Sequence, residues 1–165
     1  MPVRVGEEIQ EVLREGFVSA PARVTPWYAD GLRFACTQCG ACCSGAPGHV
    51  WVDGDEIDAI SAFLGLSPEQ FNRRHVRRVG RGRSLLELPG GDCEFLERLP
   101  DGKTRCRIHP VRPTQCRTWP FWRSNLTTLE AWRLTGRGCP GIDRGPLHPL
   151  PVIQQALADN GSRPL

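Results

Sequence analysis

Four of the eight cysteines stand within a short run, Cys36-Thr37-Gln38-Cys39-Gly40-Ala41-Cys42-Cys43. Packing does not demand such a run, because a buried free cysteine behaves as a small hydrophobic residue. Two intervening residues let the chain turn so that successive thiolates converge, and Gly40 suits a turn with positive φ. Thiolates are soft ligands for zinc, iron and iron–sulfur clusters. The run predicts a metal centre. Because adjacent Cys42 and Cys43 cannot easily both point inward, one is a candidate for a second centre or a reactive thiol.

The composition is that of a soluble globular chain. It has 165 residues, of which 39% are hydrophobic and 24% charged, with a net charge of +3. No basic segment precedes an apolar run at the N-terminus, and no apolar stretch reaches about 18 residues, so we expect neither a signal peptide nor a membrane span. We therefore expect a cytoplasmic protein. In a reducing compartment, eight cysteines favour metal ligation over a disulfide framework.

The other four cysteines are scattered, and each lies beside a turn or hairpin. Residues 93–99 and 103–108 flank an Asp101-Gly102 turn and predict a hairpin, whose open end brings Cys93 and Cys106 together. Cys116 follows after a short loop, and Cys139 stands before a proline. We expect the second half of the chain to fold back over the first cysteine run.

Short elements are expected to carry these residues. Amphipathic helices are predicted over residues 6–17 and 152–159, a helix from the N-cap Asp53 to Gly65, and a helix from the capping box at Ser67. Extended segments are predicted at 27–34, 49–52, 84–88 and 129–134, and a helical turn at 114–117. With 18 glycines and 15 prolines, the prediction is a small, loop-rich α+β domain spanning residues 1–165 as a single unit.

Three further features leave alternatives open. The arginines in residues 73–83 are interpreted as a solvated helix end and loop, since no aromatic residues interleave them for base stacking. The aromatic run 119–122 is either core or a lid over the metal. Arg112 and Arg117 either neutralise the thiolates or lie on the surface. Of the histidines, His148 is the best candidate for a nitrogen ligand.

The ordered motifs resemble a known family. They are Cys36-x2-Cys39-x2-Cys42-Cys43, Gly91-Asp92-Cys93-Glu94-Phe95-Leu96, Cys106-Arg107-Ile108-His109-Pro110 continuing to Cys116-Arg117, and Cys139-Pro140-Gly141. Over residues 34–143 the chain resembles the bacterial cysteine-cluster family known by its CxxCxxCC signature. The resemblance implies chelation of zinc or iron but supplies no reaction. In the family the position of His109 is often tyrosine, which makes His109 a poor ligand candidate. A related cluster occurs in proteins similar to flagellin lysine N-methylases, so the alternative is a metal-dependent oxidoreductase or a methylase-like, protein-modifying enzyme component.

Two metal assignments stay open. Cys36, Cys39 and Cys42 resemble three ligands of a bacterial-type ferredoxin run, which a remote Cys139-Pro140 could complete around an iron–sulfur cluster. Alternatively, the eight thiolates divide into two tetrahedra that each close a structural zinc site. The usual signature of radical S-adenosylmethionine chemistry, C-x3-C-x2-C, does not occur. The expected partner is a metal ion; a protein partner is left open and nucleic acid is not expected. The candidate ligands are Cys36, Cys39, Cys42, Cys43, Cys93, Cys106, Cys116 and Cys139.

Overall fold

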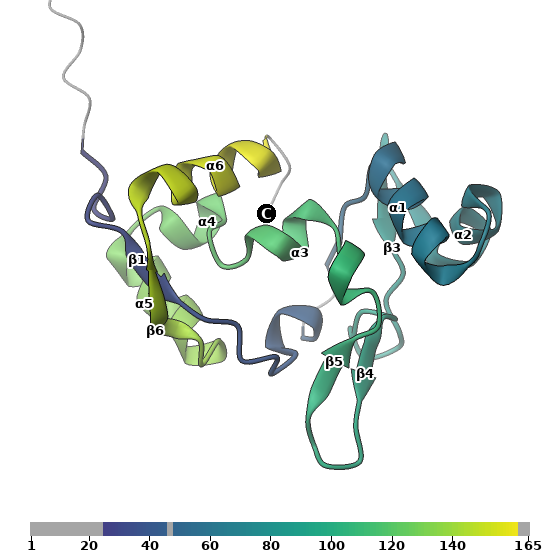
Figure 1. Cartoon of the computed structure of the whole chain (residues 1–165), viewed down its shortest axis with the longest axis horizontal. Coiled ribbons are helices and arrows are strands. Elements are labelled where there is room, and N and C mark those ends of the chain that lie inside the picture. Colours follow the sequence, from purple (N-terminus) through teal and green to yellow (C-terminus); the bar gives the residue numbers. More distant parts are fainter. Residues whose placement is uncertain (1–24, 46–47, 162–165) are drawn as a thin grey trace, which may run out of the picture.

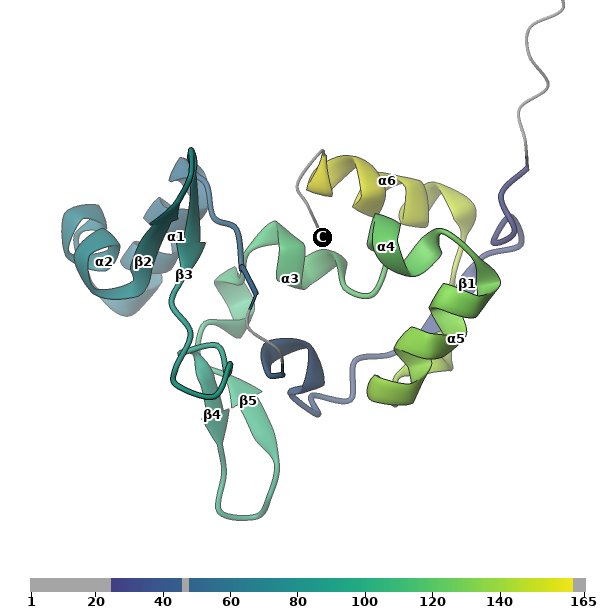
Figure 2. The same ribbon diagram turned by 180° about the vertical axis from the view of Figure 1, so that it is seen from behind.

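The computed structural model describes residues 25–45 and 48–161, so the predicted helix over residues 6–17 lies outside the described residues. Helices alternate with three two-stranded antiparallel sheets, which pair β1 with β6, β2 with β3, and β4 with β5. This confirms the predicted α+β class. Figure 1 shows the elements gathered into two lobes with α3 (Thr114–Thr118) between them, and the view from behind in Figure 2 agrees.

The first group, here called the hairpin lobe, is contiguous in sequence. It contains α1 (Gly54–Leu64), α2 (Pro68–His75), the hairpin of β2 (Val76–Val79) and β3 (Gly82–Leu85), the hairpin of β4 (Leu96–Arg98) and β5 (Thr104–Cys106), and the 3₁₀ turn η2 (His109–Val111). Both helices begin at complete capping boxes, which satisfy the free N–H groups of the first turn. Its core comprises Val52, Ile57, Ile60, Phe71, Leu85, Phe95 and Ile108.

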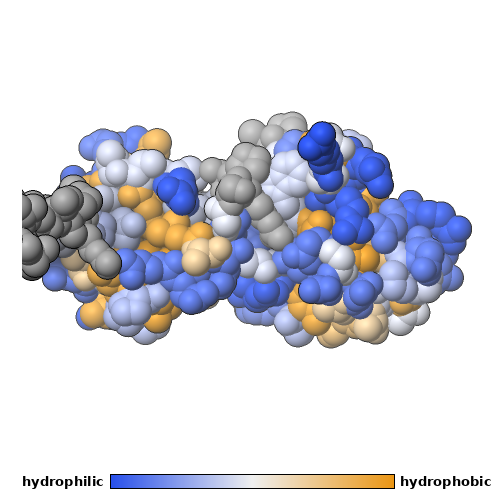
Figure 3. All heavy atoms as spheres, turned by 90° about the horizontal axis from the view of Figure 1, so that it is seen from above, coloured by the Kyte–Doolittle hydropathy of each residue, from blue (hydrophilic) through white to orange (hydrophobic). Residues whose placement is uncertain are grey.

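The second group, here called the β1–β6 lobe, joins two distant parts of the chain. It contains β1 (Leu32–Phe34), α4 (Arg123–Leu126), α5 (Leu129–Gly138), β6 (Ile142–His148) and α6 (Leu150–Asn160). Its core comprises Leu32, Phe34, Phe121, Leu126, Trp132, Cys139, Ile142, Ile153 and Ala156. In Figure 3 hydrophobic areas are visible on both sides of the molecule, whereas the far end over α2 is hydrophilic.

Several sequence predictions are confirmed and some are wrong. The helices from Asp53, from Ser67 and over 152–159 are present as α1, α2 and α6, and the 93–108 hairpin is present as β4–β5. The strand predicted at 129–134 is wrong, because this segment forms α5, capped by the Thr128 hydroxyl, which accepts from the Ala131 N–H at 3.1 Å. The predicted strand at 49–52 is reduced to a single bridge at Trp51. The arginine-rich loop is instead the β2–β3 hairpin.

The short helix α3 ties the two lobes together through buried polar groups. At its start the Thr114 N–H donates to Glu56 Oε1 at 2.7 Å. The Gln115 side chain then accepts from the Trp51 N–H and donates to the His49 carbonyl, both at 2.9 Å. At its end the Asn160 amide donates to Thr118 Oγ1 at 2.6 Å. Because Glu56, Gln115, Thr118 and Asn160 are buried, these bonds fix the helix in place without competition from water.

Candidate metal centre

All eight cysteines line one cavity of about 130 Å³. The other walls come from both lobes, including Phe34 of the β1–β6 lobe and Leu85 and Ile108 of the hairpin lobe. Cys36 to Cys43 enter from the loop after β1, whereas Cys93, Cys106, Cys116 and Cys139 come from the second half of the chain. The structure therefore brings every predicted ligand to one place.

The first cysteine run is anchored at both ends. Before it, the Ala35 N–H donates to the Gly141 carbonyl at 3.1 Å. Only glycine fits at 141, because a Cβ there would lie 2.1 Å from the Ala35 carbonyl oxygen. Within the run, the Thr104 hydroxyl of β5 donates to the Gln38 carbonyl at 2.6 Å. Gly40 has φ +75°, as its place in the turn predicts, and precedes the 3₁₀ turn η1 (Ala41–Cys43). The run thus reaches from the β1–β6 lobe to the hairpin lobe.

The later cysteines meet the run through backbone contacts. The Cys93 N–H donates to the Cys43 carbonyl at 2.7 Å, and the Leu96 N–H donates to the Cys93 carbonyl at 2.9 Å. Leu96 is the register partner of Cys106 in the β4–β5 hairpin. Figure 1 accordingly shows η1 below α3 and beside the open end of this hairpin. On the other side, the indole N–H of Trp119 donates to Cys139 Sγ at 3.5 Å.

Cys36, Cys39 and Cys42 are exposed and Cys139 is buried, whereas the half-buried Cys43, Cys93, Cys106 and Cys116 lie close enough to other thiols to disfavour one another's charge. Burial raises the pKa of Cys93 to about 11 and also raises the pKa of Cys106 and Cys116, with neighbouring thiols adding to each shift. The Sγ atoms of Cys42 and Cys43 are 3.8 Å apart. Their hydrogen bond lowers the pKa of Cys42 to about 7 and raises that of Cys43. A bound cation would favour all of these thiolates at once.

Arg112 is a cationic side chain whose charge acts on several of these thiols. It lines the cavity, and its charge contributes to lowering the pKa of Cys42 and opposes the raised pKa of Cys106 and Cys116. Its Nε is buried and has no hydrogen-bond partner within residues 25–45 and 48–161. Arg117 also lines the cavity, but its guanidinium donates to the Arg112 carbonyl and to Thr114 Oγ1.

The donor set fits a thiophilic metal, although the side chains would have to close in on it. Among the described residues, no group of three or more histidine, cysteine, aspartate or glutamate side chains is already arranged to hold an ion. The cavity nevertheless offers eight thiols, an apolar lining and the half-buried Arg112 side chain. Four thiolates are the ligand set of structural zinc and of iron–sulfur clusters. The chemistry of the lining therefore matches zinc or iron.

The histidines and the residues of the aromatic run differ in whether they line the cavity. His148 does not line the cavity; its ring nitrogen is 3.0 Å from the Phe34 carbonyl oxygen. His109 does line it, but its Nε2 contacts the Arg112 guanidinium, and burial followed by that charge lowers its pKa. In the aromatic run, Phe121 is core, whereas Trp119 packs against the same core and also lines the cavity. The Trp119 N–H and the Gly141 contact were not predicted, since both depend on partners distant in sequence.

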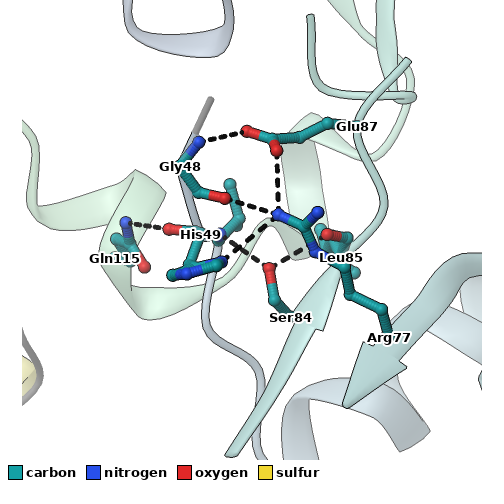
Figure 4. Close-up of polar contacts among 8 residues, drawn as sticks. Gly48, His49, Arg77, Ser84, Leu85, Glu87 and Gln115 are labelled. Atoms are coloured by element: carbon teal, nitrogen blue, oxygen red, sulfur yellow. Dashed lines mark hydrogen bonds and ion pairs between the residues drawn. The ribbon is translucent and has the colours of Figure 1, made fainter. Parts of the chain in front are cut away.

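A second cavity of about 360 Å³ touches Cys42, Cys43 and Cys93. A polar clamp forms part of its wall (Figure 4): Arg77 donates to the Gly48 carbonyl at 2.6 Å and to Glu87 at 2.8 Å, while Glu87 accepts from the Gly48 N–H at 2.9 Å. The clamp holds residues 48–50 against β2 and β3, where the Val50 N–H donates to Ser84 Oγ at 3.0 Å. Three of the eight thiols therefore face two cavities.

Comparison with known proteins agrees with metal chelation. A family model described as "CxxCxxCC: putative zinc- or iron-chelating domain" matches residues 35–140. An uncharacterized protein of Methanocaldococcus jannaschii, MJ0661, is 33% identical over 124 residues, which cover 72% of this chain and 63% of that protein. The chain therefore spans less than two thirds of this relative's length. No solved structure matches the chain. In the described part of the chain, no helix combines the length and apolar character needed to cross a membrane.

Proposed function

From the premise that the chain belongs to the CxxCxxCC family, we propose that its cysteines hold zinc or iron in the cavity between the two lobes. All eight candidates, Cys36, Cys39, Cys42, Cys43, Cys93, Cys106, Cys116 and Cys139, are proposed as ligands. The observation that carries the proposal is that residues spread over more than half of the chain all line one cavity. Packing alone would not gather eight thiols.

The metal is proposed to act first as a structural element. Cys139 belongs to the core of the β1–β6 lobe, whereas Cys93 and Cys106 pack against the core of the hairpin lobe. Thiolates from both lobes around a shared centre would join them, so that residues 1–165 behave as a single domain. Since a binding site of this kind does not exist in the unfolded chain, metal binding would contribute directly to folding. A cytoplasmic location is part of this proposal, because the ligands must stay reduced.

Arg112 is proposed to balance the charge of the loaded centre. Each additional thiolate in a buried cavity raises the cost of ionising the next one. A guanidinium remains charged at any physiological pH and offsets that cost. Two observations support this role: Arg112 lines the cavity, and its charge favours the thiolates of Cys42, Cys106 and Cys116.

Anaerobic purification followed by elemental analysis tests the proposal. We expect zinc or iron bound to the protein, and loss of that metal when the cysteines are replaced by serine. An absorption band at about 400 nm together with inorganic sulfide would identify an iron–sulfur cluster. A colourless protein with bound zinc would instead identify tetrahedral zinc sites. Metal-free protein with eight free or oxidised thiols would refute the function.

A second candidate function rests on the second cavity. An enzyme needs a pocket beside the metal or an open coordination position, whereas a structural site is closed by four protein ligands. The cavity beside Cys42, Cys43 and Cys93 is of small-molecule size. A metal-dependent oxidoreductase or methylase-like component would bind its substrate there. Exchange of a bound water or binding of an external thiol at the metal would support the enzyme; a coordination shell of protein sulfur alone would exclude it.

A further inference from the structure

We propose that Thr104 of β5 is a positioning residue for the metal ligand Cys39. Its hydroxyl holds the neighbouring residue Gln38 in a left-handed backbone conformation and thereby sets the direction of the peptide unit that leads into Cys39. The inference rests on the proposed metal binding and adds to it a residue that carries no thiol.

Gln38 has a backbone conformation that requires support from its surroundings. Its φ is +54°, in the left-handed region that glycine, asparagine and aspartate enter most readily. Within residues 25–45 and 48–161, the other non-glycine residue with positive φ is Asp143, which is one of these favoured types. A conformation of this kind costs free energy and persists where surrounding contacts impose it. The Gln38 side chain is exposed, so backbone contacts have to supply the support.

The hydrogen bond from Thr104 supplies this support. The Thr104 hydroxyl donates to the Gln38 carbonyl at 2.6 Å, and Thr104 is only 7% exposed. Because water has little access to the threonine, it competes weakly for this bond. The Gln38 carbonyl belongs to the planar peptide unit that joins Gln38 to Cys39. Fixing this oxygen therefore fixes the plane from which the Cys39 backbone continues.

The residue after Cys39 lies against the same threonine. Gly40 has φ +75°, and a Cβ there would lie 2.7 Å from Thr104 Oγ1 and 3.1 Å from Leu96 Cδ1. The two residues that flank Cys39 are thus both left-handed, and both are placed by Thr104. The Gly40 carbonyl in turn accepts the Cys43 N–H at 2.9 Å. The position of the threonine therefore also influences η1.

The β4–β5 hairpin is a suitable support for the cysteine run. Thr104 pairs with Arg98 in the hairpin register, and the cross-strand neighbours Glu97 and Arg105 form an ion pair at 2.6 Å. Thr104 and Cys39 both line the main cavity. A ligand whose backbone is ordered before binding loses less conformational entropy when the metal binds. Loss of the threonine hydroxyl should therefore weaken metal retention.

Replacement of Thr104 by residues with and without a hydroxyl tests this role. Metal release from the anaerobically purified protein is followed after addition of excess chelator. Thr104→Val keeps the shape of the side chain but removes the donor, and it should accelerate release by about 10-fold, the low end for groups that orient metal ligands. Thr104→Ser keeps the donor and should release metal at close to the wild-type rate. Release from Thr104→Val at the wild-type rate would overturn the inference.

Substitutions at Gln38 show whether Thr104 acts through this backbone conformation. Glycine adopts positive φ without strain, so Thr104→Val should have little effect when it is combined with Gln38→Gly. Gln38→Val disfavours positive φ at an exposed position and should accelerate release by itself, even if Thr104→Val fails to fold. An equally large effect of Thr104→Val with glutamine or glycine at position 38 would mean that the threonine acts only through packing. The positioning role would then be wrong.

A second threonine provides a matched control. The Thr135 hydroxyl bonds to Asn125 Oδ1 at 3.2 Å and to the Ala131 carbonyl at 2.9 Å, and Thr135 is not among the described residues that line the main cavity. Thr135→Val should release metal at the wild-type rate. Acceleration equal to that of Thr104→Val would show a general effect of lost hydroxyl groups and would contradict a specific role for Thr104.

Hydrogen exchange in the chelated protein gives a readout that does not depend on bound metal. Because the Cys43 N–H donates to the Gly40 carbonyl, Thr104→Val should increase exchange at the Cys43 amide, whereas Thr104→Ser should not. Unchanged exchange in Thr104→Val would count against the inference. Wild-type protein isolated without metal would refute the proposed function, and the exchange comparison would still decide whether Thr104 orders the run.

Discussion

The two lobes are built in opposite ways. The hairpin lobe forms from a continuous stretch, in which each helix or strand packs against a neighbour in sequence. The β1–β6 lobe instead requires β1 to pair with β6, so that Leu32 lies opposite His148. Closing so long a loop costs entropy before any contact is gained. We infer that local sequence signals are enough for the hairpin lobe to fold, whereas folding of the β1–β6 lobe depends on long-range contacts.

The cavity is where this difference matters. The cysteine run continues directly from β1, and its partners Cys93 and Cys106 belong to the locally formed lobe. A metal bound by the run and by Cys93 and Cys106 would join the two lobes through metal–thiolate bonds. These bonds would compensate for the local sequence signals that the β1–β6 lobe lacks. The bridging helix α3 supplements this link through its buried hydrogen bonds to Glu56 and Asn160. The β1–β6 lobe should therefore gain more order from the metal than the hairpin lobe does.

Metal removal should produce the largest effect. Small zinc domains draw about 10–16 kcal/mol of apparent folding free energy from their metal, so we expect chelation to lower the melting temperature strongly. Hydrogen exchange should then show lost protection first in β1 and β6, with α1 and α2 remaining protected longer. Circular dichroism and exchange on matched loaded and chelated samples provide the measurement. Simultaneous loss in both lobes would contradict the unequal dependence.

The next largest effect should come from a matched pair of core substitutions, one in each lobe. Ile60 of α1 and Ile153 of α6 are both fully buried, one in each core. Each change to alanine should cost about 2–5 kcal/mol in urea denaturation. Because α6 packs against α3, Ile153→Ala should also accelerate metal release, whereas Ile60→Ala should leave the release rate closer to wild type. Equal acceleration by both variants would show that the lobes are tightly coupled.

The same contrast explains how much of the fold was predictable. The capping boxes at Asp53 and Ser67 and the Asp101-Gly102 turn are signals within a few residues, and the elements they predict are present. In the β1–β6 lobe, the extended segment predicted at 129–134 is instead part of α5, which continues to Gly138. Ile142 packs closely against Gly136 inside this helix, where a Cβ would lie 3.3 Å from the Ile142 side chain. No nearby residue announces that contact.

For the site, residue type and spacing predicted the candidate ligands, which line one cavity, but not their neighbours. The spacing of the run indicated a metal centre, and the hairpin placed Cys93 beside Cys106. The contacts of Ala35 with Gly141 and of Cys93 with Cys43 depend on tertiary structure and could not be predicted from spacing. The identity of the metal is likewise not encoded in spacing, because zinc and iron accept the same four thiolates.

A smaller effect should distinguish a side chain that only caps its own helix from one that also bonds to α3. Glu56 and Gln70 both occupy the third position of a capping box, but only Glu56 also accepts the Thr114 N–H of α3. Gln70→Ala should cost about 0.5–1 kcal/mol. Glu56→Ala leaves two N–H groups without this acceptor and should cost about 2–4 kcal/mol. Urea denaturation measures both, and only Glu56→Ala should raise exchange in α3. Equal costs would mean that α3 is held by other contacts.

The smallest expected effect concerns charge at the junction of the lobes. Arg112 lines the cavity and favours the thiolates of Cys42, Cys106 and Cys116. Arg112→Ala should weaken metal retention by about 10-fold, at the low end for groups that support metal ligands indirectly. Arg112→Lys keeps the charge and should retain most of the affinity. Competition with a chelator of known affinity provides the measurement.

Comparison with Arg117 separates charge from position. The Arg117 guanidinium donates to the Arg112 carbonyl and to Thr114 Oγ1, so it supports the backbone near Arg112 and does not balance the thiolates directly. Arg117→Ala should therefore weaken metal retention less than Arg112→Ala, and lysine at 117 should not restore the lost geometry, because one ammonium cannot reproduce the two-point contact. Wild-type retention in Arg112→Ala would assign this arginine to the solvated surface. The two lobes would then be joined by sulfur and by α3, with no contribution from a balancing cation.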